Sequence, residues 1–200
     1  MTSDSHAYFG LFSKKNFPGS EDCERIRLEM DSSGGNPATI IKRENRLLDE
    51  SVRRTMTKEV SEETRSHLRG KLSGISDELG AYFGVELSDM QGPQFLCYRV
   101  GDFFLRHTDK GMYTESPREI KDRQVSAVVF LKDETDEPGN DTYTGGSFII
   151  YGILKDPRFE LRGFKVTGTA GTLIAFRSEM YHEVTPVTGG TRLTIVSWFL

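Results

Sequence analysis

Three residues of types that bind metal ions stand in two separate parts of the chain. His107 and Asp109 occur in the stretch "FFLRHTD", and His182 follows in "MYHEVTPV". On a β-strand, residues two apart point to the same face, so we expect the imidazole and the carboxylate to be directed together. With His182 they would form a facial set of two imidazoles and one carboxylate, which leaves open positions on the metal, as non-haem Fe(II) oxygenases require. The alternative for His107 and Asp109 is a hydrogen-bonded surface pair.

An arginine ten residues beyond His182 predicts an anion-binding group. On an extended last strand, Arg192 shares its face with Thr194, Val196 and Trp198. A guanidinium directed into an apolar barrel needs an anion, and it binds a carboxylate through two parallel hydrogen bonds. The distal carboxylate of a small dicarboxylic acid would fit. The alternative is an arginine that is solvated on the outer face of the strand.

The elements that must position these residues lie mostly after residue 90. Short runs rich in Val, Ile, Phe and Thr, separated by Gly, Pro, Asp or Asn, indicate β-strands. The predicted fold is mainly β within an α+β chain, with a jelly-roll core (a cupin-like double-stranded β-helix) backed by N-terminal helices. The eight runs cover residues 94–101, 103–109, 125–133, 145–154, 163–169, 171–178, 181–187 and 192–200.

The N-terminal part has a helical pattern. Apolar residues at helical spacing predict one helix over residues 20–31, with Ser20 as its N-cap, and a second, single helix over residues 60–83 that ends at Gly84. A short strand is expected at residues 39–42. Glycines inside the second pattern each weaken a helix by about 1 kcal/mol relative to alanine.

Length and composition favour one soluble domain. The 200 residues are 36% hydrophobic and 28% charged, which predicts a single domain over residues 1–200, with helical support in about 8–90 and the core in about 91–200. The net charge of −4 gives no basic footprint for nucleic acid, and no apolar run approaches the roughly 18 residues that span a bilayer. We therefore expect neither a nucleic-acid nor a membrane role.

The cysteines and the N-terminus bear on the compartment. No secretory signal is visible at the N-terminus, so we expect a cytoplasmic protein. Cys23 and Cys97 stand in segments that are expected to be helical or core-facing, and we predict that both are reduced thiols.

Two long connections stand out between the predicted strands. Residues 110–122 follow Asp109 directly and are a candidate lid over the site. Residues 133–144 are acidic and would disfavour acidic partners if they bordered the site, the alternative being a solvated loop.

The segments "YRVGDFFLRHTD", "RQVSAVVFLKD" and "GTLIAFRSEMYHEVTPVTGGTRLTIVSWF" resemble the prolyl 4-hydroxylase branch of the 2-oxoglutarate/Fe(II)-dependent dioxygenases. The resemblance implies that His107, Asp109 and His182 bind iron. It implies that Arg192 binds the distal carboxylate of 2-oxoglutarate and that Tyr98 also contacts this cosubstrate, while Arg123 and Trp198 line the substrate groove. It further implies Fe(II), 2-oxoglutarate and O2, with ascorbate as an optional reductant.

The implied activity is hydroxylation of an unactivated C–H bond, with a prolyl residue of a protein or peptide as the favoured substrate. Two alternatives remain open: a hydroxylase of a free amino acid or small natural product, and a non-catalytic jelly-roll binding module. Phe130 stands where the family frequently has a tyrosine whose hydroxyl helps to hold 2-oxoglutarate, which puts one polar contact in doubt. Phe104 likewise replaces a common aromatic residue that carries a hydroxyl. The oligomeric state is not predicted.

Overall fold

The computed structural model describes residues 10–42, 45–111, 116–153 and 162–200. The helices are α1 (Ser20–Ser32), α2 (Glu62–Ser73), α3 (Ser76–Phe83) and α4 (Arg118–Lys121). The strands are β1 (Phe12–Lys15), β2 (Gly35–Pro37), β3 (Ile40–Lys42), β4 (Asn45–Leu47), β5 (Arg53–Arg54), β6 (Met56–Lys58), β7 (Met90–Tyr98), β8 (Phe103–His107), β9 (Val125–Phe130), β10 (Asp133–Glu134), β11 (Thr142–Gly145), β12 (Phe148–Ile150), β13 (Phe164–Val166), β14 (Thr172–Arg177), β15 (His182–Val184), β16 (Val187–Gly190) and β17 (Arg192–Phe199).

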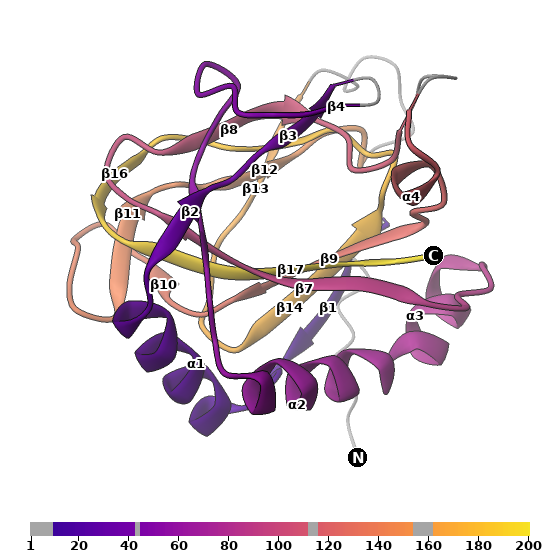
Figure 1. Cartoon of the computed structure of the whole chain (residues 1–200), viewed down its shortest axis with the longest axis horizontal. Helices are drawn as coiled ribbons and strands as arrows, with labels where there is room; N and C mark the ends of the chain where they lie inside the picture. Colours follow the sequence, from indigo (N-terminus) through magenta and orange to yellow (C-terminus); the bar gives the residue numbers. More distant parts are fainter. Residues whose placement is uncertain (1–9, 43–44, 112–115, 154–161) are drawn as a thin grey trace.

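Two antiparallel sheets form the core of the fold. The larger sheet has the order β1-β14-β9-β17-β7-β6-β2, and the second has the order β13-β12-β15-β8-β5. Figure 1 shows β17 and β7 crossing the middle of the molecule, with β8, β12 and β13 above them. Strands far apart in sequence are neighbours, such as β9 and β17, which is the connectivity of a jelly roll. A three-stranded sheet, β10-β11-β16, and the β3-β4 hairpin complete the strands.

The alternation of side chains along β9 and β17 separates two cores. One set of residues packs toward the helices and belongs to the first core: Val125, Ala127, Val129, Leu193, Ile195 and Phe199. The alternate set points between the two sheets, where the apolar members Val128 and Phe130 join the second core. Because successive side chains of a strand point to opposite faces, both faces of this sheet are covered. The interior between the sheets is where polar residues of β17 have to lie.

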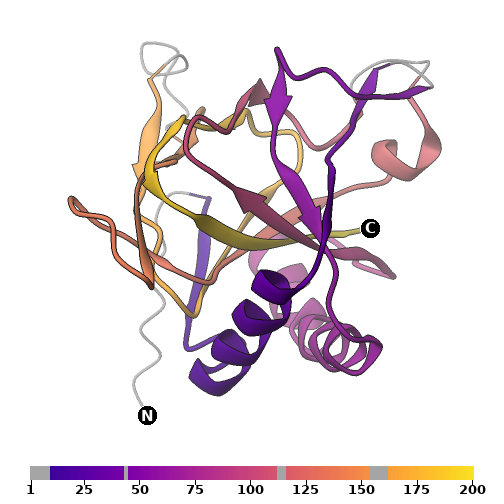
Figure 2. The same cartoon turned by 60° about the vertical axis from the view of Figure 1, so that its left-hand side comes forward.

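Helices α1, α2 and α3 cover the outer face of the larger sheet, as Figures 1 and 2 show for α1 and α2. Their buried side chains pack on that face: Ile26, Met30, Leu68, Leu72, Leu79 and Phe83. Among the described residues, no helix has the length and apolar character needed to cross a membrane. Cys23 and Cys97 are buried free thiols, as predicted.

Two details of the helix predictions are wrong. The single helix over residues 60–83 is divided into α2 and α3, because α2 ends at Gly74, whose N–H donates to the carbonyl of Gly70 at 2.9 Å. Glycine gives little support to a helix interior. The N-cap of α1 is Gly19 rather than Ser20, and no side chain caps this end. The predicted end at Gly84 is confirmed, with a left-handed φ of 65° that favours glycine.

The long connection at residues 133–144 differs from expectation, because it contains paired strands rather than only loop. Residues 133–144 hold β10 and the first part of β11, which pair in parallel, and Asp141 forms an ion pair with Arg27 at 3.4 Å. Part of the predicted lid, residues 112–115, lies outside the described residues. On either side of that gap, the N–H of Gly111 donates to the carbonyl of Ile120 at 2.9 Å.

Leu68 offers a test of the packing between α2 and the larger sheet. Its side chain is fully buried, so Leu68→Ala is expected to lower the free energy of unfolding by about 2–5 kcal/mol through lost burial and a residual cavity. Denaturant unfolding followed by circular dichroism measures this change. The matched control is Leu28→Ala on α1, where the side chain is 65% exposed and the expected change is within about 0.5 kcal/mol. Equal losses in the two variants would contradict the described packing.

Candidate active site

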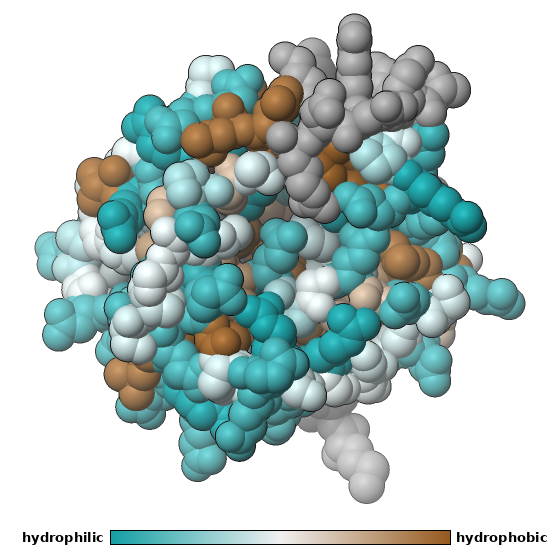
Figure 3. Space-filling model, in the orientation of Figure 1, coloured by the Kyte–Doolittle hydropathy of each residue, from teal (hydrophilic) through white to brown (hydrophobic). Residues whose placement is uncertain are grey.

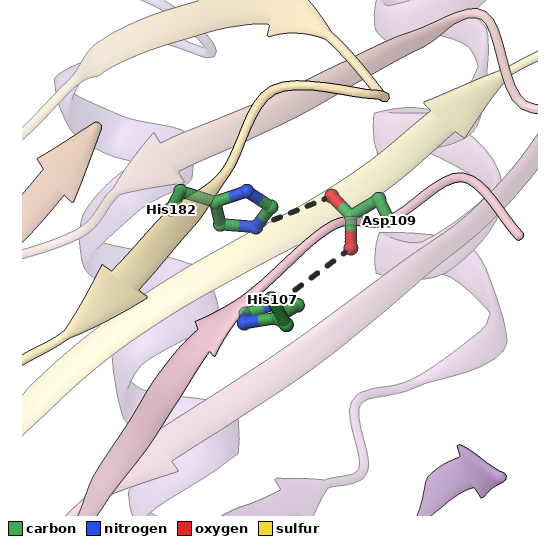
Figure 4. Close-up of side chains that lie close together, drawn as sticks. All are labelled: His107, Asp109 and His182. Atoms are coloured by element: carbon green, nitrogen blue, oxygen red, sulfur yellow. Dashed lines mark ion pairs between the residues drawn. The ribbon is translucent and has the colours of Figure 1, made fainter. Parts of the chain in front are cut away.

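The two histidines and the aspartate converge between the sheets. Nε2 of His182 lies 3.5 Å from Oδ2 of Asp109, and Nε2 of His107 lies 3.9 Å from Oδ1 of the same carboxylate. Figure 4 shows the three side chains directed toward one another. One ligand atom from each residue lies within 4.8 Å of those of the other two. This spacing suits three ligands of one divalent ion.

Strand pairing brings these distant residues together. His182 on β15 is the direct partner of His107 at the end of β8. Asp109 does not continue the strand as predicted, because β8 ends at His107. Its N–H instead donates to the carbonyl of Ser178 at 3.0 Å, as does the N–H of Lys110 at 2.9 Å. The loop after β8 is therefore fixed by two backbone hydrogen bonds.

Both imidazoles are oriented through their second nitrogen. Nδ1 of His107 lies 2.8 Å from the carbonyl of Leu105, and Nδ1 of His182 lies 3.0 Å from the carbonyl of Met180. A carbonyl only accepts, so each Nδ1 is the protonated nitrogen of the neutral ring and each Nε2 keeps its lone pair. Such hydrogen bonds fix the tautomer and the orientation of a metal-binding histidine.

The charge states at neutral pH suit metal binding. Burial lowers the pKa of His107 to about 3, and the nearby His182 adds to this shift. Burial alone would raise the pKa of Asp109, but the two histidines lower it below its ordinary value. His107 is thus neutral and Asp109 is ionised, the forms in which both groups bind a metal.

Aromatic rings surround the two imidazoles. The Phe104 ring stacks on His107 with centroids 3.5 Å apart, and the Phe176 ring meets His182 edge-on at 4.8 Å. The Phe104 ring packs against the second core and also forms part of the wall around the site. These rings keep water away from the back of the site.

A cavity of about 410 Å³ opens beside the three residues. Its walls come from both sheets and from the segment that leads into β3. The polar members of the wall are Thr39, Arg53, Thr57, Gln94, Tyr98, His107, Thr108, Asp109, Arg123, His182, Arg192 and Thr194. No described residue of the acidic segment 133–144 lines this cavity directly, although Tyr143 near the end of that segment lies close to Arg192.

Arg192 lies at the wall of this cavity as predicted. It is 1% exposed, and its guanidinium lies 5.0 Å from the centroid of the Tyr98 ring. Nη1 donates to Oγ1 of Thr194 at 3.2 Å, whereas Nε has no partner among the described residues. No carboxylate of the described chain pairs with this group. A buried guanidinium with an unmet donor and no carboxylate partner is suited to bind an anionic ligand.

Tyr143 on β11 is a residue that sequence reasoning missed. It is buried, and while burial raises the pKa of its hydroxyl, the nearby Arg192 guanidinium acts in the opposite direction. A methyl group at Gly168 would collide with this hydroxyl and lie 2.9 Å from Cδ1 of Phe130. The rings of Tyr143 and Phe130 therefore both border the space that Gly168 leaves open by having no side chain. At Gly146, a methyl group would lie 3.1 Å from Cδ of Arg192 and 3.5 Å from Cε2 of Tyr143. Tyr143 therefore brings a hydroxyl beside Phe130, which itself lacks one.

The remaining predicted residues, Arg123 and Trp198, lie together at the cavity wall. The Arg123 guanidinium lies 3.8 Å from the centroid of the Trp198 ring and donates to the carbonyl of Asp109 at 3.3 Å. Nε of Arg123 also donates to Oε1 of Gln91 at 2.9 Å. The pair is thus joined to the loop that carries Asp109.

Fold and site together define a jelly roll that holds a facial group of two histidines and one carboxylate next to a buried arginine. The model of the 2OG-Fe(II) oxygenase superfamily matches residues 93–200, more than half of the chain. The chain belongs to that superfamily. Its members are named for Fe(II) and 2-oxoglutarate, which fit the metal-binding triad and the anion-binding arginine found here.

Curated relatives are similar to about half of the chain. A PKHD-type hydroxylase of Teredinibacter turnerae is 31% identical over 106 residues, which are 53% of this chain and 41% of the relative. Another PKHD-type hydroxylase, from Nitrobacter winogradskyi, is 33% identical over 107 residues, 53% of this chain and 42% of its own. The chain thus spans about two fifths of the length of these relatives.

Solved structures share the fold over nearly the whole chain. A prolyl-4-hydroxylase of Pseudomonas putida has a TM-score of 0.69 at 24% identity, covering 98% of this chain and 95% of that one. A prolyl hydroxylase of Trichoplax adhaerens, solved with a peptide fragment of hypoxia inducible factor, has a TM-score of 0.70 at 18% identity, with 96% and 84% covered. At these identities the likeness confirms the predicted jelly-roll fold.

Proposed function

We propose that this protein is an Fe(II)- and 2-oxoglutarate-dependent dioxygenase that hydroxylates an unactivated C–H bond. The observation that carries the proposal is the convergence of His107, Asp109 and His182 at a cavity whose wall contains an unpaired arginine. Bound Fe(II) would supply the activation of dioxygen. One oxygen atom enters the substrate as a hydroxyl group, and the other enters 2-oxoglutarate, which leaves as succinate and carbon dioxide.

Different residues of the chain would bind the iron, bind the cosubstrate and exclude water. His107, Asp109 and His182 would hold the iron through Nε2 and carboxylate oxygen atoms. Arg192 would pair with the distal carboxylate of 2-oxoglutarate, and Tyr98, whose ring lies next to that guanidinium, would contact the same cosubstrate. The aromatic rings around the histidines exclude water from this end of the cavity. We propose that residues 1–200 act as one domain, in which the helices support the larger sheet.

The favoured substrate is a prolyl residue of a protein or peptide. Support comes from the relatives named PKHD-type hydroxylases and from the structural neighbours named prolyl hydroxylases. The Trp198 ring offers an apolar surface to a pyrrolidine ring. In Figure 3, hydrophobic side chains gather along the edge where Figure 1 places β3, β4 and β8, and exposed Leu47, Leu48 and Leu105 belong to this region. Such an edge suits contact with a polypeptide.

One set of measurements distinguishes the proposed function from its two alternatives, a small-molecule hydroxylase and a non-catalytic binding module. Fe(II)-dependent conversion of 2-oxoglutarate to succinate is expected of either hydroxylase and is not expected of a binding module. Mass spectrometry of a proline-containing peptide library, incubated with Fe(II), 2-oxoglutarate and ascorbate, then tests the substrate. A proline that gains one oxygen atom supports the favoured substrate. Oxidation of a free amino acid instead, with no modified peptide, would identify a small-molecule hydroxylase.

Tyr143→Phe tests whether the hydroxyl beside Phe130 takes part in holding the cosubstrate. We expect the dissociation constant of N-oxalylglycine, a 2-oxoglutarate analogue, to rise about twofold to tenfold, the range of one neutral hydrogen bond. Titration calorimetry of the Mn(II)-loaded protein measures it. The control is Tyr151→Phe, whose hydroxyl donates to Glu183 at 2.9 Å and whose ring lies beside Arg106 rather than Arg192. Unchanged affinity in Tyr143→Phe would show that this hydroxyl takes no part.

A further inference from the structure

The walls of the cavity carry an excess of positive charge. Among the described lining residues, three are arginines, Arg53, Arg123 and Arg192, and one is a carboxylate, Asp109. The lining therefore has two net positive charges. Fe(II) and the dianion 2-oxoglutarate cancel each other's charge when both are bound, so this excess persists in the loaded site. An anionic group in the substrate would balance this excess.

Of the three arginines that line the cavity, Arg53 has no role in the proposed function. It belongs to β5, and the backbone of β5 pairs with β8, the strand that ends at His107. Its guanidinium lies 4.7 Å from the centroid of the Phe104 ring, and that ring stacks on His107. Arg53 thus lies close to the metal-binding triad, on the side that β5 and the segment before β3 provide.

The hydrogen-bonding groups of Arg53 are incompletely used. Nη1 donates to the carbonyl of Thr39 at 3.1 Å, while Nε is buried and has no partner. No carboxylate in the described parts of the chain forms an ion pair with it. Arg123 differs, because it donates to Gln91 and to the carbonyl of Asp109. An unpaired guanidinium in a cavity wall binds carboxylates well, owing to its planar array of donors.

We propose that Arg53 forms an anion-binding subsite for the substrate, so that the preferred substrate carries a carboxylate close to the carbon that is hydroxylated. This inference rests on the proposed function and deepens it by naming a substrate class. The carboxylate belongs either to an acidic side chain next to the target residue of a peptide or to a free amino acid. In both cases the guanidinium of Arg53 binds the carboxylate in the same way.

The test uses binding as well as turnover. Full-length protein loaded with Mn(II) and N-oxalylglycine is immobilised and exposed to two peptide pools, each with a single proline. One pool has Asp or Glu at the flanking positions, and the other has Asn or Gln. L-Proline and L-prolinamide form a second matched pair for the free-acid case. The thermal shift caused by Mn(II) and N-oxalylglycine confirms the loaded state independently of either pair.

Arg53→Gln and Arg54→Gln are the matched variants. Arg54 is the next residue of β5, is exposed, and does not line this cavity. With the parent protein and with Arg54→Gln, we expect the acidic member of a pair to be retained about ten- to a hundredfold more than its neutral counterpart, as for a charge-assisted hydrogen bond. Arg53→Gln should abolish this preference, and Arg53→Lys should restore part of it.

The outcomes distinguish a failure of the Arg53 inference from a failure of the proposed dioxygenase function. A purely structural role for Arg53, through its hydrogen bond to Thr39, would lower retention of both members equally and would overturn the inference. Equal retention by the parent protein, or no retention of any acidic probe, would also overturn it while leaving the metal and cosubstrate sites intact. Failure to bind Mn(II) or N-oxalylglycine would contradict the proposed function itself.

Discussion

Replacing His107, Asp109 or His182 with alanine is expected to abolish succinate formation. Each residue would supply one of three protein ligands, and the other two cannot hold the ion in its open facial geometry. Loss even of a group that orients a ligand typically costs ten- to a hundredfold in metal affinity or activity, so loss of a ligand should exceed about a hundredfold. Metal content after anaerobic equilibration with Fe(II), together with succinate formation, measures both consequences.

The matched control is His67→Ala. His67 lies on α2, outside the cavity, and pairs with Asp22 at 3.1 Å. It should leave metal content and turnover unchanged. In a crystal soaked with Mn(II), the ion should lie about 2.0–2.2 Å from the two Nε2 atoms and one oxygen of Asp109, as is typical of such ligands. Near-normal succinate formation by any of the three alanine variants would contradict the assignment.

Arg192→Ala is expected to raise the concentration of 2-oxoglutarate needed for half-maximal turnover about ten- to a hundredfold. This range follows from the loss of a charge-assisted pair, which typically contributes about 1.5–3 kcal/mol. Iron binding should be unaffected, because among the described residues no hydrogen bond or ion pair joins Arg192 to the three metal-binding residues. Kinetics at varied 2-oxoglutarate and binding of N-oxalylglycine both report this effect.

Arg192→Lys separates charge from geometry. A lysine keeps the positive charge but cannot form the two parallel hydrogen bonds of a guanidinium, so an intermediate requirement for 2-oxoglutarate is expected. Measurement of Mn(II) affinity in both variants shows whether the metal site stays intact. If Arg192→Ala bound N-oxalylglycine as tightly as the parent, then the proposed role of Arg192 would be wrong.

Much of the jelly roll was predictable because strand periodicity is a local property. The alternation in β17 correctly placed Arg192, Thr194, Val196 and Trp198 on one face, and all four line the cavity. His107 and His182 lie together as predicted, because their strands pair. The short N-terminal strands β1, β2, β5 and β6 were not predicted, since two to four residues carry little pattern and depend on distant partners.

Three features of the site were not predicted, namely how the chain positions Asp109 and where Tyr143 and Arg53 lie, and all three depend on contacts between distant segments. Asp109 reaches the histidines through hydrogen bonds to Ser178 rather than by continuing β8. Tyr143 lies in a segment that was expected to be a loop, and its place beside Phe130 depends on open space at two glycines. Arg53 enters the cavity from a two-residue strand. Spacing along the chain contains no signal for any of these arrangements.

The outer strands of the seven-stranded sheet have a consequence for self-association. A free strand edge can template another chain, and this leads to aggregation unless charges, proline or short length prevent it. At one edge, β1 carries Lys14 and Lys15; at the other, β2 has three residues and ends in Pro37, which has no N–H to donate. Neither edge favours the growth of a fibril. A polypeptide substrate of the proposed kind would therefore be held by side chains at the cavity rather than added to this sheet as another strand.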